Sequence, residues 1–354
     1  MLRRHLLGTA SALALWPGLG HGLPPAQLRF PRDHGSHPDF QTEWWYITGH
    51  ATSGGRQFGF QLTFFRSRVA STQAMSSHFA AKQLLLAHAA ITDVQGQKLW
   101  HDQRLARAGF AVAEASESDT SLRLLDWSLQ REPGPPALFT AHLPAADFSL
   151  DLRLSATQPP LLQGQQGLSR KGPQAEQASY YVSQPQLAVA GTLSLQGRSF
   201  KIDAGRAWLD HEWSQAVLHP QAVGWDWIGM NLDNGDALTA FHLRRADGSA
   251  LWAGGSYRSA EGKLQVFASE AVRFTPGRIW LSPHSQGRYP VEWRVQTPAG
   301  TFAVHAVVDA QELDSRASTG TQYWEGLSTL SDAAGRRLGL GYLEMTGYVG
   351  RLRL

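Results

Sequence analysis

Residues Ala204 to Trp213, which read AGRAWLDHEW, decide how the fold is interpreted. In an extended strand, side chains alternate between two faces. The acids Asp210 and Glu212 would then share one face with Trp208, and His211 would lie on the other with the closing tryptophan. Charged groups among indoles are rarely buried without partners. The stretch indicates either an ion-paired strand that closes a domain or a desolvated carboxyl group that does chemistry.

Short aromatic or β-branched stretches surround this strand. Glu43–His50 reads EWWYITGH and is typical of a strand, and Gln57–Arg66 alternates with Phe58, Phe60 and Phe64 on one face. Turn residues separate these stretches along the whole chain. Almost no segment has the hydrophobic repeat of an α-helix together with capping residues at its ends. The pattern therefore predicts an all-β fold of antiparallel strands that close into barrels.

The same pattern gives the domain boundaries. The sequence has 354 residues, which is enough for two domains of ordinary size. We expect a signal peptide over residues 1–22, an N-terminal domain over 23–215 and a C-terminal domain over 216–354. A similarity between Gly55–Phe60 and Gly335–Leu340 favours a tandem duplication. Gln158–Ser179 is rich in Pro, Gly and Gln, and we expect a loop across a barrel mouth, with a disordered excursion as the alternative. Ser71–Ala81 is predicted to be a short helix.

Composition excludes several functional classes. The formal charge of +3 is small and no Lys/Arg-rich run carries interleaved aromatic residues, so nucleic acid is not an expected partner. Cysteine is absent, which excludes disulfides, thiolate metal sites and Cys nucleophiles. The 13 tryptophans suit a β protein with large aromatic side chains in its core or in a cavity. No cofactor and no oligomeric state is indicated.

The N-terminus predicts export. Residues 1–22 begin with a basic MLRRH segment, continue with a short apolar run and end in small residues. This order is typical of a secretory signal peptide, and it is too short for a confident membrane span. Arg3 and Arg4 also resemble a twin-arginine signal. An uncleaved membrane anchor is the alternative, and we expect the periplasm or cell envelope in either case.

Three blocks of sequence resemble one protein family. They are FPRDHG with EWWYITGH, AWLDHEW, and YWEG with GYLEMTGY, at Phe30–Gly35 with Glu43–His50, Ala207–Trp213, and Tyr323–Gly326 with Gly341–Tyr348. Together they are similar to the secreted lipocalin-like proteins related to carotenoid 1,2-hydratase, which include the AttH proteins encoded beside ABC transporters. The resemblance spans nearly the whole mature chain. It implies two tandem lipocalin-like β-barrels, and an ABC transporter as a partner, but fold and family alone do not fix function.

A lipocalin-like barrel can hold one small ligand. An apolar lining would select a lipophilic molecule. The alternative is that these aromatic side chains fill a closed core, as most apolar side chains do. The candidate ligand-binding residues are Trp45, Phe58, Phe60, Phe64, Trp208, Trp213, Trp225, Trp227 and Trp324.

The catalytic candidates Asp210, His211 and Glu212 allow three kinds of chemistry. A metal site lacks a partner histidine at fixed spacing, with only His219 and His242 as candidates, so no metal is assigned. Acyl hydrolysis lacks a Gly-x-Ser-x-Gly nucleophile. A hydratase is coherent, because a carboxylic acid in an apolar cavity has a raised pKa and can protonate an alkene.

A hydratase also needs a group that deprotonates the attacking water. His211 or a second carboxylate would serve, and Glu43 is the leading candidate, with Glu325 and Glu344 as others. Each acid is otherwise a structural ion-pair partner, with Arg66 or Arg206 as the candidate cation. We expect Asp210 to be buried beside aromatic residues and positioned by His211. The leading function is an exported binder of a hydrophobic small molecule, with hydro-lyase activity on an isoprenoid double bond as the alternative; a purely structural envelope protein comes third.

Overall fold

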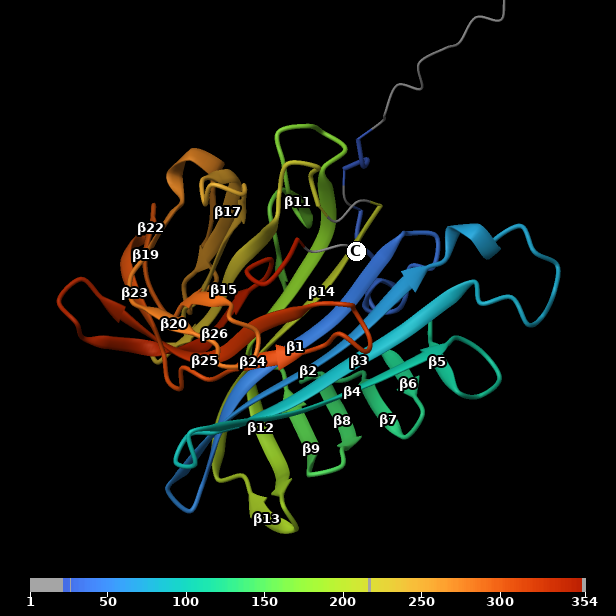
Figure 1. The fold of residues 1–354 in the computed structure, drawn as a ribbon, viewed down its shortest axis with the longest axis horizontal. Coiled ribbons are helices and arrows are strands. Elements are labelled where there is room, and N and C mark those ends of the chain that lie inside the picture. The colour runs from blue at the N-terminus through green and yellow to red at the C-terminus, as the bar shows by residue number, and fades with distance from the viewer. Residues whose placement is uncertain (1–21, 26, 216–217, 352–354) are drawn as a thin grey trace, which may run out of the picture.

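The computed structural model describes residues 22–25, 27–215 and 218–351, and it is almost entirely β (Figure 1). The predicted signal peptide lies outside the described residues except for Gly22. No helix in the described part of the chain has the length and apolar character needed to cross a membrane. Over the described residues, the helical content is three short 3-10 turns, η1 (Arg32–His34), η2 (Ala70–Thr72) and η3 (Ser269–Ala271).

The first sheet follows the path β4-β3-β2-β1-β14-β12-β9-β8-β7-β6-β5, with three short strands paired to β12. Its far ends approach each other where β3 and β4 meet β6, so the barrel is nearly closed. The strands are β1 (Thr42–Ser53), β2 (Arg56–Arg68), β3 (Gln83–Asp93), β4 (Lys98–Arg107), β5 (Ala113–Ala115), β6 (Ser121–Leu124), β7 (Trp127–Glu132), β8 (Leu138–Pro144), β9 (Phe148–Ser155), β10 (Leu161–Leu162), β11 (Leu168–Arg170), β12 (Ala178–Leu195), β13 (Arg198–Lys201) and β14 (Ala204–Ser214).

The second sheet follows the path β18-β17-β16-β15-β26-β25-β23-β22-β19 and forms a half-barrel. The strands, including a separate β20–β21 pair, are β15 (Gly224–Leu232), β16 (Ala237–Arg244), β17 (Ala250–Arg258), β18 (Leu264–Phe267), β19 (Arg273–Pro276), β20 (Ile279–Leu281), β21 (Arg288–Pro290), β22 (Glu292–Thr297), β23 (Gly300–Ala306), β24 (Glu312–Asp314), β25 (Gln322–Asp332) and β26 (Arg337–Met345). The predicted fold class, all-β with two tandem lipocalin-like barrels, is confirmed.

The two sheets repeat one strand order. In the first, β2-β1-β14-β12 are neighbours, and in the second β16-β15-β26-β25 take the same places. This repetition is what a tandem duplication would leave. The short sequence similarity noted above pairs the start of β2 with the start of β26, and these strands do not occupy equivalent places. It is therefore not the trace of the duplication.

The segment between β2 and β3 corrects one expectation. Ser71–Ala81 does not form a helix, because only the single turn η2 is present. The Thr72 hydroxyl donates to the carbonyl oxygens of Val69 and Ala81, at 3.0 and 2.8 Å. A side chain that bonds nearby backbone offers an alternative to the helical ladder. The segment is thus a closed loop.

The Pro-, Gly- and Gln-rich segment 158–179 joins the two halves. Two of its short strands, β10 and β11, pair with β12 of the first sheet. From the second sheet, Ser256 donates to Gln163 at 2.8 Å, and Trp252 Nε1 donates to the carbonyl oxygen of Arg170 at 3.0 Å. Direct contacts between β1 and β26 and between β14 and β15 complete the junction (Figure 1).

Candidate functional site

A cavity of about 340 Å³ lies between the two halves. Its wall comes from β1, β2, β3, β12 and β14 of the first sheet and from β15, β16, β25 and β26 of the second. Lys171 and the loop around Ser318–Thr321 complete it. Most of the wall is apolar. The titratable side chains on it are Glu43, Tyr46, Arg66, His88, Lys171, Tyr181, Asp210, Glu212, Tyr323, Glu325 and Glu344.

Strand alternation decides which residues reach this cavity. On β1, Trp44 and Tyr46 are on its wall, and Trp45 between them points into the packed interior of the first barrel. On β14, Asp210 and Glu212 are on the wall. The cavity therefore lies outside the first barrel, against the second half. The two acids share a face, as predicted from the alternation.

Asp210 is buried in a shell of hydrogen-bond donors. The Tyr181 hydroxyl donates to its Oδ2 at 2.7 Å, and Ser183 Oγ and Trp208 Nε1 donate to its Oδ1 at 2.5 and 2.7 Å. Burial raises the pKa of Asp210 to about 7, although these three donors oppose the shift. Trp227 Nε1 donates in turn to the Tyr181 hydroxyl at 3.2 Å. Near neutral pH, Asp210 can therefore either hold or release a proton.

Glu212 is an ion-paired carboxylate. Lys171 Nζ lies 2.9 Å from its Oε1, and Ser179 Oγ donates to the same oxygen at 2.5 Å. The Lys171 ammonium also lies 4.5 Å from the ring centroid of Tyr181 and 4.4 Å from that of Phe241. Such distances give cation–π attraction that strengthens when the pair is desolvated. The loop segment therefore supplies the cation that balances one of the two acids on β14.

Two further acids face the cavity from the second half. Glu325 on β25 and Glu344 on β26 are directly opposite each other in the strand register. Burial, and then the neighbouring Glu344, raise the pKa of Glu325 well above its usual range. Burial, with the charges of Asp210, Glu212 and Asp226, raises the pKa of Glu344 to about 7. Like charges at such a position cannot both ionise easily, so the pair retains a proton.

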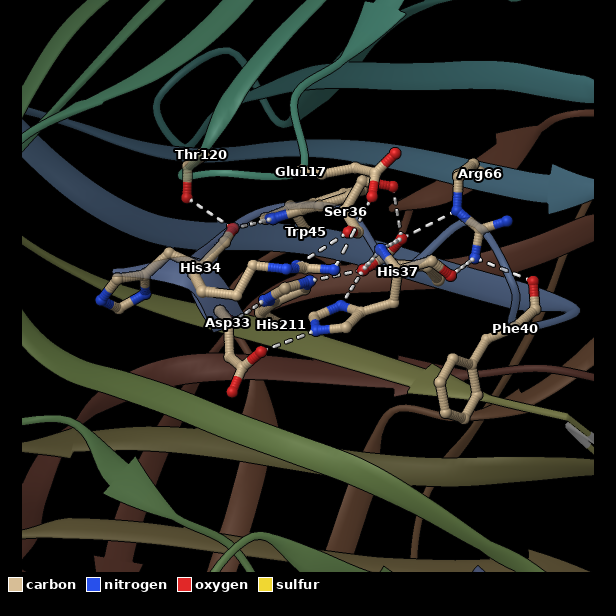
Figure 2. A network of polar contacts seen from close by, with 12 residues as sticks. Asp33, His34, Ser36, His37, Phe40, Trp45, Arg66, Glu117, Thr120 and His211 are labelled. Carbon is tan, nitrogen blue, oxygen red and sulfur yellow. Dashed lines mark hydrogen bonds and ion pairs between the residues drawn. The ribbon is translucent and has the colours of Figure 1, made fainter. Parts of the chain in front are cut away.

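Glu43 borders the cavity, but its carboxylate is buried in a polar network inside the first half. Figure 2 shows Ser36, His37, Arg66 and His211 of this network. Its Oε2 accepts from Arg66 Nε at 2.8 Å and from Ser36 Oγ at 2.9 Å, and the ring nitrogens of His37 and His211 lie 2.8 and 2.9 Å from its Oε1. Burial alone would raise the pKa of Glu43, but the hydrogen bonds from the two histidines hold it well below its usual range. Glu43 is therefore a charged structural partner.

The position of His211 corrects another expectation. His211 does not position Asp210, because the two side chains lie on opposite faces of β14. Its Nδ1 is 3.1 Å from the Asp33 carbonyl oxygen, and its ring stacks on Trp45 with centroids 4.6 Å apart. Burial lowers the pKa of His211, against the opposing effect of Glu43. Asp210 is instead positioned by Tyr181, with Ser183 and Trp208.

His37, Glu43 and His211 offer ligand atoms that all lie within 4.8 Å of one another. Nitrogen and carboxylate ligands of this kind suit zinc. However, the Arg66 guanidinium already pairs with Glu43, and both carboxylate oxygens accept hydrogen bonds. A metal cation would add charge beside that guanidinium, so the arrangement fits an ion-paired network better than a metal centre.

The other metal candidates lie apart from this cluster. His219 is in the connection between the sheets, where its Nδ1 accepts from the backbone of Gln221. His242 on β16 pairs with Asp226, with Nε2 and Oδ2 2.5 Å apart. Arg244 Nε and the Tyr348 hydroxyl also donate to that carboxylate, at 2.7 and 2.8 Å. Asp226 is thus the buried carboxylate that pairs with an arginine and a histidine in the second half, as Glu43 is in the first.

The predicted ligand-binding aromatics divide into two groups. Trp225 and Trp227 are on the cavity wall, and Trp208 lies beside it as a donor to Asp210. The others are not on the wall. They are buried in packed structure, where Trp213 stacks on His37 and Trp324 Nε1 donates to the Asp309 carbonyl oxygen. The residues in this second group are Trp45, Phe58, Phe60, Phe64, Trp213 and Trp324.

The apolar face of β2 accounts for the largest correction. Phe58, Phe60 and Phe64 are at most 1% exposed and fill the interior of the first barrel. The other face of the same strand, with Thr63 and Phe65, lines the cavity. A fully buried aromatic stripe packs a solid core, whereas a site needs space and mixed polarity. The closed-core alternative holds for this stripe.

Sequence reasoning missed several residues of the site. Lys171 lies in a segment without periodicity, and nothing in the sequence near it indicates a contact with Glu212. Tyr181 and Ser183 alternate on β12, and only the strand register shows that they pair with β14. Tyr46 lies in the EWWYITGH motif quoted above. Strand alternation alone predicts that it shares a face with Trp44, and this is the face that lines the cavity.

Comparisons with known proteins agree with this fold. The family described as AttH-like matches residues 21–348. A crystal structure from Nitrosomonas europaea that carries the name AttH is 45% identical, with a TM-score of 0.85, and the match covers 92% of this chain and 98% of that chain. No curated protein sequence matches the chain.

More distant structures share the fold alone. Kievitone hydratase from Nectria haematococca is 13% identical with a TM-score of 0.71, over 91% of this chain and 94% of that chain. CghA in complex with Sch210972 is 12% identical with a TM-score of 0.57, over 89% of this chain and 90% of that chain.

Proposed function

We propose that this chain, which belongs to the AttH-like family, binds a lipophilic small molecule in the cavity between its two halves. The observation that carries the proposal is the mixed wall of that cavity. Aromatic and aliphatic side chains surround a few polar groups, among them the buried Asp210 and the half-buried Glu344. A largely apolar hollow with a few convergent polar groups is the usual form of a small-molecule site.

The size of the cavity supports a ligand of modest volume. About 340 Å³ is near the lower end of typical ligand pockets, which run from roughly 300 to 1,000 Å³. Trp225 and Trp227 provide flat apolar faces on one side, and Leu84 and Leu86 provide aliphatic surface on another. A ligand with a fused aromatic or compact isoprenoid body fits this wall.

Calorimetric titration with 2-naphthylmethanol tests this proposal. Leu243 on β16 lines the cavity, so Leu243→Trp should fill part of it. Leu105 on β4 is 45% exposed and is not on the cavity wall, so Leu105→Trp is the matched control. We expect saturable one-to-one binding to wild type and Leu105→Trp, and at least tenfold weaker binding to a folded Leu243→Trp. Equal binding to all three proteins would overturn the proposal.

The protonation state of Asp210 favours a second candidate, a hydro-lyase. A half-protonated acid in an apolar cavity can give its proton to one alkene carbon, leaving a carbocation near the Trp227 ring. Water then adds through its oxygen, and Glu344 takes the surplus water proton. Overall, the π bond of the alkene and one O–H bond of water are broken, and one C–H bond and one C–O bond form. The proton taken by Glu344 passes to solvent, and Asp210 takes up a proton from solvent to complete the cycle. The fold is shared with a protein named as a hydratase, at low identity.

Incubation with geraniol in heavy-oxygen water tests this second candidate. The hydrated product would carry the heavy oxygen and is measured by mass spectrometry. Asp210→Asn removes the transferable proton, so its rate should fall by about 10²–10⁴, the usual contribution of acid–base catalysis. The candidate fails if wild type forms no such product, or if folded Asp210→Asn forms it at the wild-type rate.

Export and a transporter partner complete the proposal. The basic, apolar and small-residue order of residues 1–22 supports passage to the periplasm or cell envelope by the twin-arginine route. Replacing Arg3 and Arg4 by Lys should leave precursor in the cytoplasm, measured by cell fractionation; unchanged export would refute the route. Delivery of the ligand to an ABC transporter stays a prediction that rests on the family resemblance.

A further inference from the structure

We infer that the ligand of this cavity carries a basic nitrogen, whose ammonium group pairs with Glu344 and Glu325 on the wall of the second half. The inference rests on the proposed function and names the chemical class of the ligand. It predicts a lipophilic amine rather than a neutral or acidic lipid. Three observations carry it: unbalanced acids, unpaired polar atoms, and an ammonium already bound in the same cavity.

The acids on the wall outnumber the cations that face them. Arg66 pairs with Glu43, and Lys171 pairs with Glu212. Among the described residues, Asp210, Glu325 and Glu344 have no ion-pair partner within 4.0 Å. Desolvated carboxyl groups without a cation are costly when ionised, and a cationic ligand would remove that cost. The wall therefore has room for positive charge and none for a further negative group.

Two polar atoms at the same place lack partners. The Tyr46 hydroxyl and the Glu325 carboxyl group are buried near enough to each other to shift each other's pKa, but neither the hydroxyl nor Glu325 Oε1 has a partner at hydrogen-bonding distance in the part of the chain that the structure describes. Both side chains are on the cavity wall, and the residues are 7% and 2% exposed. Buried polar atoms in native proteins are nearly always paired. An ammonium group offers three N–H donors, which suit a carboxylate oxygen and a phenol oxygen.

Lys171 shows how this cavity holds an ammonium group. Its Nζ pairs with Glu212 at 2.9 Å and lies within 4.5 Å of two aromatic ring centroids. Glu344 has the equivalent place in the second half. In the first sheet Trp44 is opposite Glu212 across β1 and β14, and in the second Trp227 is opposite Glu344 across β15 and β26. Glu344 thus matches Glu212 in its place in the sheet and in having a tryptophan opposite it, but no lysine of the described residues pairs with Glu344.

A matched series of probes tests the inference. Full-length mature protein is titrated with 2-naphthylmethylamine, 2-naphthylmethanol and 2-naphthoate at pH 7 by calorimetry. We expect the amine to bind at least tenfold more tightly than the alcohol and the carboxylate to bind most weakly. Repeating the amine titration in buffers of different ionisation enthalpy should reveal proton release, because a bound cation favours the ionised carboxyl pair. The alcohol should release none.

A variant assigns the effect to the two acids. Glu325→Gln combined with Glu344→Gln preserves shape and removes the charge, and should reduce the amine-to-alcohol affinity ratio to below threefold. Glu114→Gln on the exposed surface is the control and should leave the ratio unchanged. If the double variant fails to fold, the wild-type titrations test the inference: proton release on binding of the amine supports it, and no proton release overturns it. Equal affinities without proton release overturn the inference while the proposed function stands, and a ratio retained in the folded double variant also overturns it. If none of the probes binds, the proposed function itself fails.

Discussion

Replacing Asp210 by Asn should change how the stability of the protein depends on pH. Burial raises the pKa of Asp210 from 3.8 to about 7. The folded state therefore binds a proton that the unfolded state has lost between these values, so the contribution of Asp210 to stability is present at low pH and is lost as pH rises. For one group, the free energy of unfolding falls by about 2 kcal/mol between pH 5 and pH 7.

Chemical denaturation at pH 5, 6 and 7, monitored by tryptophan fluorescence, measures this effect. Several buried histidines and Glu344 also titrate in wild type, so the informative quantity is the difference between wild type and Asp210→Asn. Asn keeps an acceptor for Ser183 and Trp208 but gives the Tyr181 hydroxyl no acceptor, which costs about 1–3 kcal/mol at every pH. Relative to wild type, the variant should gain about 2 kcal/mol from pH 5 to pH 7.

The exposed residue Asp147 provides the control, and Asp147→Asn should show no such gain. A difference between wild type and Asp210→Asn that stays constant over this pH range would refute the reasoning. It would mean that the three donors outweigh burial, and that Asp210 is ionised throughout. The hydro-lyase candidate would then lose its proton donor at neutral pH.

Three further substitutions test the account. Phe60→Ala should lower the free energy of unfolding by roughly 3–5 kcal/mol, because Phe60 fills the packed core, while affinity for 2-naphthylmethanol stays within twofold; a larger loss of affinity in the folded variant would contradict its placement. Glu43→Gln should cost roughly 3–5 kcal/mol near pH 7, because it leaves Arg66 buried without its partner. The cost should shrink as pH falls below about 4.5, the unfolded-state pKa of Glu43, since the folded pKa is depressed; a cost that does not change with pH in denaturation experiments would contradict this. Lys171→Met should lower the free energy of unfolding by roughly 3–5 kcal/mol, because it leaves the buried Glu212 carboxylate without its cation; a loss below about 1 kcal/mol in denaturation, the scale of an exposed pair, would contradict the pairing.

Alternation along strands could be predicted from the sequence, and it placed Asp210 and Glu212 together on one face and His211 on the other. What packs against each face could not be predicted from alternation. The apolar stripe Phe58–Phe64 was compatible with a cavity or a core, and only the path of the sheet shows that it faces the closed interior. The site lies on the opposite face because the second half covers it there.

Arg66 was named as a candidate partner and does pair with Glu43, but most partners of the buried acids could not be predicted from the sequence. Glu43, Arg66 and His211 come from three separate strands, and their meeting depends on the register between β1, β2 and β14. Lys171 lies in a loop whose sequence has no hydrophobic periodicity from which its contacts could be predicted. Contacts of this kind arise from tertiary pairing, which leaves no local signal in one sequence. The fold class did leave such a signal, since it rests on short strands and turns.

A crystal structure of the complex with 6-bromo-2-naphthylmethanol tests most directly whether the space between the two halves is the binding site. The anomalous signal of bromine marks the ligand position without reference to the surrounding density. We predict a single bromine peak inside the cavity, between Trp227 of the second half and Asp210 of the first. A peak inside the first barrel or on the outer surface, at a probe concentration that saturates calorimetric binding, would contradict the account.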